Sequence, residues 1–434
     1  MEKGINKKIV NEISKIKKEP KWMTDFRNKA YAKFEELPNP SFGPELKIDF
    51  NNITYYKKVG QNSNNWDQVP KDVKDMFDKL GIIEAEQKYL AGVGAQVESE
   101  SIYHNMMEEL LKKNVIFCDT DTALKKYPEL FKKYFGTLVR YDENKYTALN
   151  GAVWSGGTFI YIPPNTKLDR PLQSYFRINS INMGQFERTL IIVDDNSELH
   201  YMEGCTAPTY SMDSLHAAVV EIFVGKNSKC RYTTIQNWSN NVYNLVTKRA
   251  IVDDGGLMEW VDGNIGSKTN MKYPGCILKG NNSTGRCISI AISTKNQIQD
   301  TGARMIHLGN NTSSEIISKS IAANGGDTTY RGKVKISKNA LNSKSTIKCD
   351  TILIDDISRS DTVPINIVEN DSSNINHEAT VSKISNEKLF YLMSRGISEE
   401  KAKELLIMGF IDRFREELPM EYAVELNNLL KNYF

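Results

Sequence analysis

The sequence predicts a mostly β protein, a right-handed parallel β-helix (a solenoid) with helical regions at both ends. Three observations predict this fold. A short apolar run that ends in a polar turn recurs at intervals of 31, 31, 28, 26, 30, 28 and 32 residues. The runs beside these turns are β-branched or alternating, which is typical of strands. No helical period is visible between about 140 and 380.

The repeated turns are rich in Asn, Asp and Gly, the residues that favour tight turns. The eight apolar runs end at Ile162, Val193, Val224, Val252, Leu278, Leu308, Ile336 and Val368. A fixed period of this length indicates a repeat architecture, and crossovers between parallel strands are nearly always right-handed. A β-sandwich or barrel with coincidental spacing is the alternative, and eight copies at so narrow an interval disfavour it.

The N-terminal region, residues 1–138, is expected to be mainly helical. Its candidate helices carry Phe26, Ala30 and Phe34 on one face, or span Ser101–Asn114 and Thr122–Phe135. A loop rich in Asn, Pro and Gly separates the first helices from the others, and the solenoid core is expected over residues 139–383.

The pattern changes at residue 384, and residues 384–434 read as helical. The signals are Ser385 and Ser398 as N-caps, Gly396 as a helix end and Pro419 as the start of a last helix. A solenoid needs caps because its end strands have open edges. Capping and the docking of a partner protein are both open as roles for these helices.

Composition places the chain among ordinary intracellular proteins. It has 434 residues, a net charge of +2 and 25% charged residues, so nothing implies nucleic acid as a partner. The charged N-terminus lacks the apolar segment of a signal peptide, and no apolar stretch is long enough to span a membrane. The six cysteines form no C-x-x-C pair. We therefore expect a cytoplasmic protein with reduced thiols.

Motifs for catalysis are missing from the sequence. It contains no G-x-x-x-x-G-K-[ST], no H-E-x-x-H and no G-x-S-x-G, and five histidines make a multi-histidine metal site improbable. A β-helix enzyme that acts on polysaccharides would be expected to carry a signal peptide and a cleft of clustered acids, and neither is evident. The expectation is a protein that is not an enzyme.

One constellation can carry metal chemistry. Glu378 follows Cys349 by 29 positions (378 − 349), with His377 beside it. One solenoid coil would stack these residues, because neighbouring strands lie about 4.8 Å apart. A thiolate and a carboxylate, assisted by the imidazole, would hold an iron–sulfur cluster loosely and transiently. The alternative has Cys349 pointing inward and Glu378 in a solvated turn, since a slip of one residue reverses the face.

A second stack is expected near the start of the solenoid. Cys205 and Gln236 are 31 positions apart (236 − 205), at the same place in consecutive repeats. Further polar or aromatic residues could extend this stack into a path along the interior: Arg177, Asn179, Trp238 and Lys248. A structural ladder is the alternative, because polar groups inside a solenoid need partners.

Several long blocks of the sequence resemble the SufB family, the scaffold subunit of iron–sulfur cluster assembly. They begin at Tyr89 (YLAGVGAQ), Phe176 (FRIN), Met183 (MGQFER), Glu203 (EGCTAP), Gln236 (QNW), Asn244 (NLVTKR), His377 (HEAT), Tyr391 (YLMSRG) and Glu417 (ELPMEYAVE). The resemblance covers roughly residues 65–430 and implies a right-handed β-helix flanked by helices.

The resemblance also implies partners and roles. The C-terminal helices would dock a SufC-type ATPase, and the C-terminal end of the solenoid would pair with a SufD-type paralogue or a second copy. The family's cluster-building residues fall on Cys349, His377 and Glu378, while Asn376 replaces an acid found in some relatives. A sulfur donor protein would load Cys205, and the transfer route would follow Arg177, Asn179, Gln236, Trp238 and Lys248.

One alternative remains within this family. A structural paralogue would hold the ATPase and the partner without a cluster site of its own. Such a subunit need not keep the Cys349, His377 and Glu378 set, so the presence of that set favours the scaffold.

Overall fold

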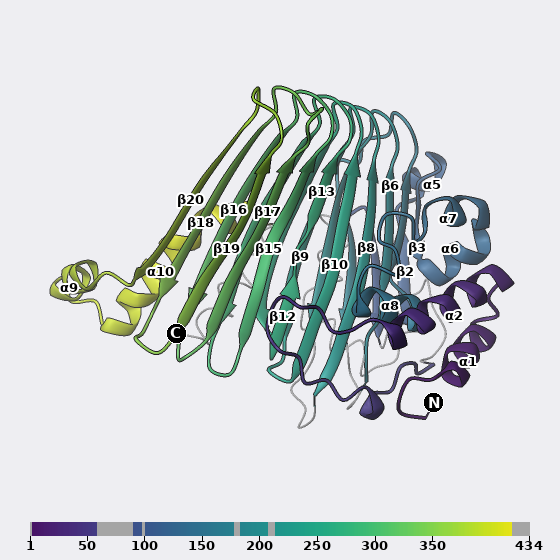
Figure 1. Cartoon of the computed structure of the whole chain (residues 1–434), viewed down its shortest axis with the longest axis horizontal. Coiled ribbons are helices and arrows are strands. Elements are labelled where there is room, and N and C mark those ends of the chain that lie inside the picture. Colours follow the sequence, from purple (N-terminus) through teal and green to yellow (C-terminus); the bar gives the residue numbers. More distant parts are fainter. Residues whose placement is uncertain (1, 59–89, 98–99, 178–182, 207–212, 419–434) are drawn as a thin grey trace.

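The computed structural model describes residues 2–58, 90–97, 100–177, 183–206 and 213–418. Their core is a parallel β-solenoid made of two facing sheets, with helices at both ends (Figure 1). Within the solenoid each coil contributes one strand to each sheet, except for one coil whose strand in the second sheet is divided in two. The predicted mostly β solenoid is confirmed.

The first sheet contains ten strands. In spatial order these are β2 (Glu100–Met106), β1 (Gly92–Val97), β5 (Leu172–Arg177), β7 (Glu198–Thr206), β9 (Lys229–Trp238), β11 (Leu257–Gly266), β14 (Thr284–Ser293), β16 (Ser313–Ala322), β18 (Lys344–Leu353) and β20 (Asn374–Lys383). Neighbours pair in parallel, except β1 with β2 at the N-terminal edge.

The second sheet faces the first. In spatial order it contains β19 (Arg359–Val368), β17 (Asp327–Ile336), β15 (Ile298–His307), β12 (Thr269–Lys272), β10 (Val242–Val252), β8 (Ser214–Val224), β6 (Arg188–Val193), β4 (Thr158–Ile162) and β3 (Ile116–Asp119). A further short strand, β13 (Gly275–Leu278), follows β12 and pairs with β10 and β15. Only β3 and β4 pair antiparallel among the described strands of this sheet.

The repeated polar turns form one corner of the coils. Their asparagines adopt left-handed backbone with φ between 52° and 58°, a conformation that asparagine tolerates better than most residues; they are Asn165, Asn196, Asn227, Asn282, Asn311 and Asn342. The serine after each turn is buried, and its hydroxyl oxygen accepts a hydrogen bond from a backbone amide of the preceding coil. Ser197 Oγ accepts from the Thr166 amide at 3.1 Å, and Ser228 Oγ accepts from the Ser197 amide at 3.0 Å. These repeated bonds fix the coil period.

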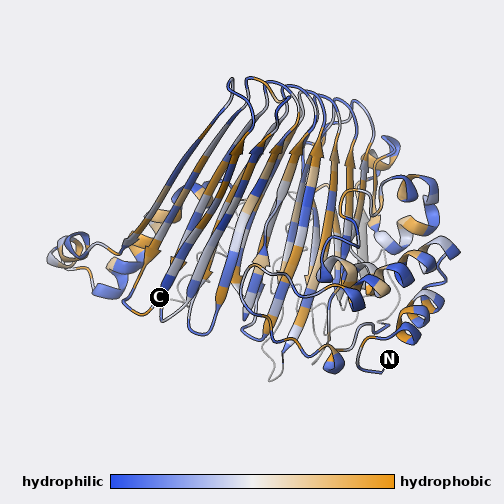
Figure 2. Cartoon of the chain, in the orientation of Figure 1, coloured by the Kyte–Doolittle hydropathy of each residue, from blue (hydrophilic) through white to orange (hydrophobic). Residues whose placement is uncertain are grey.

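Apolar side chains fill the space between the sheets. The largest buried cluster runs from Phe117 near the first coils to Ile347 near the last. Apolar residues, drawn orange, recur on strand after strand in the middle of the solenoid, whereas the connecting loops are mainly hydrophilic (Figure 2). Burial of these stripes provides the main stabilisation of the stack.

The N-terminal region combines helices with the first strands of the sheets. Its helical elements are α1 (Lys7–Lys17), α2 (Lys21–Glu36), a 3-10 turn (Phe50–Asn52), α5 (Glu108–Lys112), α6 (Thr120–Lys126), α7 (Pro128–Tyr134) and α8 (Lys145–Val153). The expected face of α2 is confirmed, since Ala30 and Phe34 are buried. At Gly151 of α8 an added Cβ would lie 2.9 Å from the Ala30 Cβ, so the two helices pack closely.

Two helix predictions in this region are wrong in detail. The segment Ser101–Asn114 begins as strand β2, and only the short α5 follows it. The span Thr122–Phe135 is two helices that meet at Pro128, because proline starts a helix readily and interrupts one already running. Strand β1 pairs with β5 over six residues, so the first sheet extends into residues 1–138.

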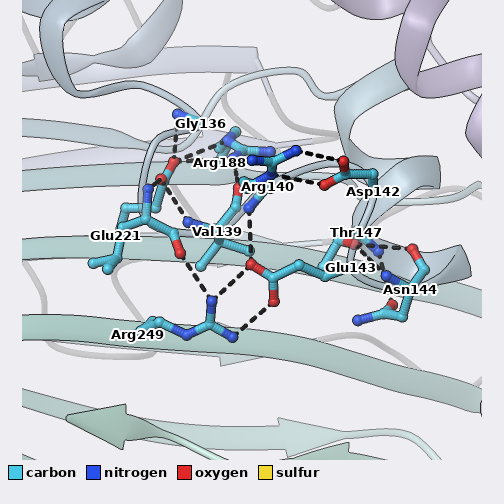
Figure 3. Close-up of polar contacts among 11 residues, drawn as sticks. Gly136, Val139, Arg140, Asp142, Glu143, Asn144, Thr147, Arg188, Glu221 and Arg249 are labelled. Carbon is cyan, nitrogen blue, oxygen red and sulfur yellow. Dashed lines mark hydrogen bonds and ion pairs between the residues drawn. The ribbon is translucent and has the colours of Figure 1, made fainter. Parts of the chain in front are cut away.

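A buried ion pair anchors the loop between α7 and α8 on the second sheet. Arg188 of β6 and Glu221 of β8 lie 3.0 Å apart with both side chains fully buried (Figure 3). The Glu221 carboxylate also accepts hydrogen bonds from the amides of Gly136, Leu138 and Val139. These bonds satisfy the buried charge and hold the loop in place.

The C-terminal helices begin where the sequence predicts. Ser385 caps α9 (Asn386–Ser394) and Ser398 caps α10 (Glu399–Glu416), and Gly396 between them has φ 85°. The last helix expected from Pro419 to about Lys431 lies outside the described residues. No described helix combines the length and apolar character needed to cross a membrane.

The two C-terminal helices sit differently on the solenoid. Helix α10 packs Ile407, Ile411 and Phe414 into an apolar cluster on the outer face of the first sheet. Helix α9 extends beyond the end of the sheets (yellow in Figure 1) and leaves Phe390 and Tyr391 exposed.

Candidate functional site

A row of polar side chains runs through the interior of the first sheet. Parallel register places one residue of each strand beside the next, and every second residue faces inward. The row, called here the interior polar row, consists of Glu203, Thr234, Asp262, Ser289, Ser318 and Cys349. All six are buried, at 7% exposure or less. The row connects a thiol region near the first coils with the thiol at the last.

Near the first coils, Cys205 lies beside a buried carboxyl group. Its Sγ is 3.7 Å from Glu203 Oε1, and the Tyr232 hydroxyl donates to Glu203 Oε2 at 2.6 Å. Burial raises the pKa of Glu203, and burial together with the Glu203 charge raises the pKa of Cys205 well above its usual value. The Cys205 thiol is therefore protonated at neutral pH.

Two buried lysines share one carboxylate in the same network. Lys248 Nζ lies 3.0 Å and Lys272 Nζ 3.3 Å from Asp262 Oδ1. Burial raises the pKa of Asp262, but the two ammonium groups outweigh it and hold that pKa at about 2. Burial lowers the pKa of Lys272 to about 8. Two lysines thus face one carboxylate inside the solenoid.

A chain of amides and a histidine extends the network toward the second sheet. Gln236 Oε1 accepts from Lys272 Nζ at 3.0 Å and from Asn244 Nδ2 at 2.9 Å. His216 bonds Asn244 Oδ1 at 2.5 Å and Glu187 Oε2 at 2.7 Å. Burial opposes protonation of His216, yet the Glu187 charge and these bonds raise its pKa overall.

The structure brings most of the expected transfer residues together. Gln236 is the register partner of Cys205, and Trp238 belongs to the same small buried cluster as Cys205. Lys248 reaches the network through Thr234 and Asp262. Arg177 ends strand β5 and is half-buried. Asn179 lies outside the described residues.

At the last coils, Cys349 meets His377. Cys349 Sγ lies 3.8 Å from His377 Nε2, and Asn366 Nδ2 of β19 lies 3.2 Å from His377 Nδ1. An amide donor at Nδ1 leaves the proton of the neutral ring on Nε2, which faces the sulfur. Burial lowers the pKa of His377, so the ring is neutral at pH 7.

The Cys349 thiol is also protonated at rest. Burial raises its pKa to about 12, against a smaller opposing effect of the nearby Tyr330 hydroxyl. Its 4% exposure results from the cover that the terminal coil provides. Proton loss, which metal binding requires of a thiol, therefore depends on a positive charge or an opening at this site.

Glu378 does not join this pair. Its register partner is Lys348, one residue before Cys349, so its side chain points to the outer face of the sheet. There its carboxylate is 3.8 Å from Lys348 Nζ and largely exposed. Within the described residues, no three His, Cys, Asp or Glu side chains converge as metal ligands. The expected set is thus divided into an inner pair and an outer carboxylate.

The terminal coil above the pair is open to solvent. Strands β19 and β20 are the last in their sheets, and Val363, Ile365, Ile367 and Val381 are 37–50% exposed. Their outer backbone edges have no neighbouring strand in the described chain. Exposed apolar strands with free edges are the features on which another sheet can pair.

Sequence reasoning missed several members of these networks. Glu203, Asp262 and Lys272 complete the buried charges. At the terminal pair, Asn366 bonds His377, and the Tyr330 hydroxyl influences the pKa of Cys349. A signal for part of this was present: Glu203, Thr234 and Asp262 recur at the period of the repeat. It was hidden because inward and outward positions can be separated only when the register is known.

Fold and site define a β-solenoid protein with buried thiols at both ends of a polar interior. Family comparison gives the class: a SUF system FeS cluster assembly SufBD core domain matches residues 176–410, and a SufBD N-terminal region matches residues 10–174. The chain belongs to the SufBD family of iron–sulfur cluster assembly proteins, and its role lies in the SUF system.

Full-length relatives agree with this assignment. Iron-sulfur cluster assembly SufBD family proteins of Staphylococcus epidermidis, Staphylococcus haemolyticus and Staphylococcus aureus are each 59% identical to this chain over 432 residues. Each alignment covers 99% of this chain and 93% of the relative.

Proposed function

We propose that this chain is the scaffold on which a transient iron–sulfur cluster is assembled and from which it is passed on. The observation that carries the proposal is the Cys349–His377 pair, which lies at the end of the interior polar row under a single open coil. The cluster is cargo, bound and released, and the chain acts as a scaffold, with no catalytic role.

The chemistry of the pair suits iron. A tetrahedral metal with bonds of about 2.3 Å to sulfur and about 2.0 Å to nitrogen separates these two donors by roughly 3.5 Å. The observed 3.8 Å between Cys349 Sγ and His377 Nε2 is close to that value. Nε2 can bind iron only when the ring proton moves to Nδ1, which requires the Asn366 amide to turn its oxygen toward that nitrogen. Two protein ligands leave the remaining iron positions to sulfide, to a partner or to a receiving protein, which suits handover.

Glu378 enters the proposal as an auxiliary ligand. Its carboxylate can reach the pair only if the terminal strand β20 twists or changes register, because it now points to the opposite face. Strand β20 is free to do so, since it has a neighbour on one side only among the described strands. A partner that pairs with β19 and β20 would set which arrangement is adopted.

The interior polar row is the proposed route for sulfur. Because Cys205 is buried, the donor protein must first open the coils around it. Its persulfide then gives its outer sulfur to Cys205: the donor S–S bond breaks, a new S–S bond forms on Cys205, and the donor leaves as a thiol. Glu203 is placed to accept the Cys205 proton, and the Lys248–Lys272–Asp262 trio can balance the negative charge of a persulfide. Arg177, Asn179, Gln236 and Trp238 belong to the entry of this route.

Two surfaces are proposed for partners. Helix α9, with exposed Phe390 and Tyr391, would dock a SufC-type ATPase, and the open strands β19 and β20 would pair with a SufD-type paralogue or a second copy. Helix α10 lies against the first sheet through Ile411 and Phe414. Movement of the docked ATPase would therefore be transmitted to the coils near Cys349.

The alternative is a structural paralogue that only holds the ATPase and its partner. Such a subunit has no need of a thiol facing an imidazole, or of buried charges along the interior. Six buried polar positions in one row cost desolvation energy that an apolar row would avoid. That cost favours the scaffold.

The test is cluster assembly with and without the terminal thiol. The chain is purified anaerobically with its ATPase, supplied with iron and a persulfide donor, and followed by visible absorption. Cys349→Ala is expected to abolish the cluster spectrum. Cys287→Ala removes another fully buried thiol of the same interior and is expected to retain the spectrum. Normal cluster yield from Cys349→Ala would refute the scaffold site.

The same assay compares the contributions of the imidazole and the carboxylate to cluster yield. His377→Ala is expected to reduce cluster yield more than Glu378→Gln, because only the imidazole contacts the sulfur in this structure. The reverse order would show that β20 rearranges to bring the carboxylate inward.

A further inference from the structure

A cavity of about 410 Å³ lies on the outer face of the second sheet, whereas the Lys248 and Lys272 ammonium groups of the proposed sulfur route lie on its inner face. Its floor is formed where β12 ends at Lys272 and β13 begins at Gly275, an interruption of one coil around Pro274. The N-terminal segment after α2 crosses this face of the sheet (purple in Figure 1) and contributes Phe42 to the wall. A volume in this range matches that of small-molecule sites.

Basic residues line the floor in a single row. Parallel register places Arg249, Gly275, Arg304 and Lys333 side by side on four successive strands. Gly275 leaves the second position of the row without a side chain, so there is room between the two guanidinium groups. The cavity therefore opens onto a row of three cations.

The charge of Arg249 is already compensated. It forms a two-pronged ion pair with Glu143 at 2.7 and 2.8 Å and donates to the Leu138 carbonyl oxygen (Figure 3). Arg304 and Lys333 have no acidic partner within 4.0 Å among the described residues. Like charges on neighbouring strands destabilise a sheet, and a bound anion would remove that repulsion.

Two aromatic rings hold the Arg304 guanidinium. Its centre lies 5.3 Å from the Tyr273 ring and 5.6 Å from the Phe42 ring. The Tyr273 hydroxyl donates to Asp300 at 2.7 Å, which fixes that ring. Gly43 has φ 85°, and an added Cβ there would lie 2.6 Å from the Met271 side chain, so the Phe42 position depends on this glycine. The guanidinium is thus oriented but keeps donors for a ligand.

We infer that this cavity binds a small aromatic anion, with its phosphate or carboxylate on Arg304 and Lys333 and its ring against Phe42 and Tyr273. Arginine and lysine bind such groups through charge-assisted hydrogen bonds, and aromatic walls favour a flat ring. The helix N-terminus at Asn144 and Tyr146 borders the same space and adds a partial positive charge. Burial, together with repulsion from Arg249, lowers the pKa of Arg304 against the opposing effects of Tyr273 and Glu143.

The test uses two probes with the same ring system. 4-Methylumbelliferyl phosphate and coumarin-3-carboxylate are titrated into the full chain, and binding is followed by isothermal titration calorimetry. Saturable binding of at least one probe is expected, and which one binds more tightly identifies the anionic group. Inorganic phosphate and 4-methylumbelliferone, as competitors, separate the contributions of anion and ring.

Matched variants test whether the probes bind in this cavity. Arg304→Gln and Lys333→Gln are each expected to weaken binding by roughly tenfold or more, since hydrogen bonds to charged groups contribute at that level. Lys335→Gln makes the same charge change on the same face of β17, but Lys335 pairs with Glu369 and does not line the cavity. It is expected to bind like the parent chain. Phe42→Ala should weaken the binding of both probes. It should leave the affinity for inorganic phosphate, measured by competition, unchanged.

Three outcomes would overturn the inference. They are the absence of saturable binding of both probes up to about 1 mM, equal affinity in the parent and Arg304→Gln chains, and an equal loss in Lys335→Gln and Lys333→Gln. Thermal melting of each variant distinguishes misfolding from a specific loss of the binding site. Because the cavity lies on the outer face, Cys349→Ala should bind the probes normally whether or not it forms a cluster.

Discussion

The two ends of the solenoid differ in how they are closed. At the N-terminal end, antiparallel strands β2 and β3 finish the sheets, helices pack against them, and Arg188 and Glu221 form a buried ion pair. At the C-terminal end, β19 and β20 are exposed and their edges are free in the described chain. The thiol at each end is buried, but Cys205 lies under several layers and Cys349 under one coil. The difference indicates that the N-terminal end is closed by packing, whereas the C-terminal end can open by displacement of a single coil.

The largest expected contrast is in thiol reactivity. Cys349 should react with iodoacetamide in the folded chain, while Cys205 stays unmodified over the same time. Because the pKa of Cys349 is about 12, its thiolate fraction and alkylation rate should rise about a thousandfold between pH 7 and pH 10. Peptide mapping by mass spectrometry measures both sites in one sample. Faster modification of Cys205 than of Cys349 would contradict the contrast.

Ion pairs at the two ends should differ in the same direction. Glu221→Gln leaves the fully buried Arg188 without its charge partner and should lower the free energy of unfolding by about 3–5 kcal/mol. Glu378→Gln breaks an exposed pair with Lys348 and should cost less than about 1 kcal/mol. Chemical denaturation followed by circular dichroism gives both values. A loss below about 1 kcal/mol in Glu221→Gln as well would show that the N-terminal anchor is dispensable.

Acid should lower the stability of both halves of the solenoid against unfolding. Burial lowers the pKa of His200 and of His307 from 6.5 to about 4. Between these values the unfolded chain takes up protons that the folded chain refuses, so stability is complete above pH 6.5 and falls as the pH drops toward 4. Each histidine accounts for at most about 3 kcal/mol of this loss.

Glutamine variants separate the two histidines. His307→Gln and His200→Gln should each flatten the decline in denaturation midpoint between pH 7.5 and pH 4.5. His307 bonds Thr312 at 2.8 Å and Ser314 at 2.9 Å, so its variant reports on the C-terminal half. An unchanged acid profile in both variants would assign the decline to other groups.

The smallest expected effect concerns the repeated turns. Asn196→Ala places alanine at φ 57° and should cost about 1 kcal/mol, whereas Asn196→Gly should be nearly neutral. The same pair of changes at Asn342, which has φ 54° nearer the open end, tests whether the corner matters equally there. Denaturation midpoints of the four variants check this, and equal costs for alanine and glycine would contradict the role of the left-handed turn.

The repeat could be predicted from the sequence because every coil needs the same tight turn at one corner. Each corner needs a left-handed residue, so asparagines such as Asn196 and Asn311 recur at the coil period, and the caps Ser385 and Ser398 follow equally local rules. Strand β2 was mistaken for a helix, because its pairing with β1 depends on contacts that its own seven residues do not encode.

The site was only partly predictable for a related reason. Spacing brought Cys349 near His377 and Glu378, but alternation along β20 decides which of the two faces the sulfur. The charges of Asp262 and Lys272 were invisible because an isolated acid or lysine in sequence resembles a surface residue. Their burial becomes evident only when the two sheets face each other with the correct strand register.

The single coil above Cys349 also sets how the site can open. Each coil of a solenoid contacts only its neighbours, so the terminal coil is held by one interface where the inner coils are held by two. Fraying of that coil would uncover the sulfur while the remainder of the stack stays folded, at a fraction of the global unfolding free energy. Amide hydrogens of β19 and β20 should accordingly exchange first, and a docked neighbour would slow them and act as a latch.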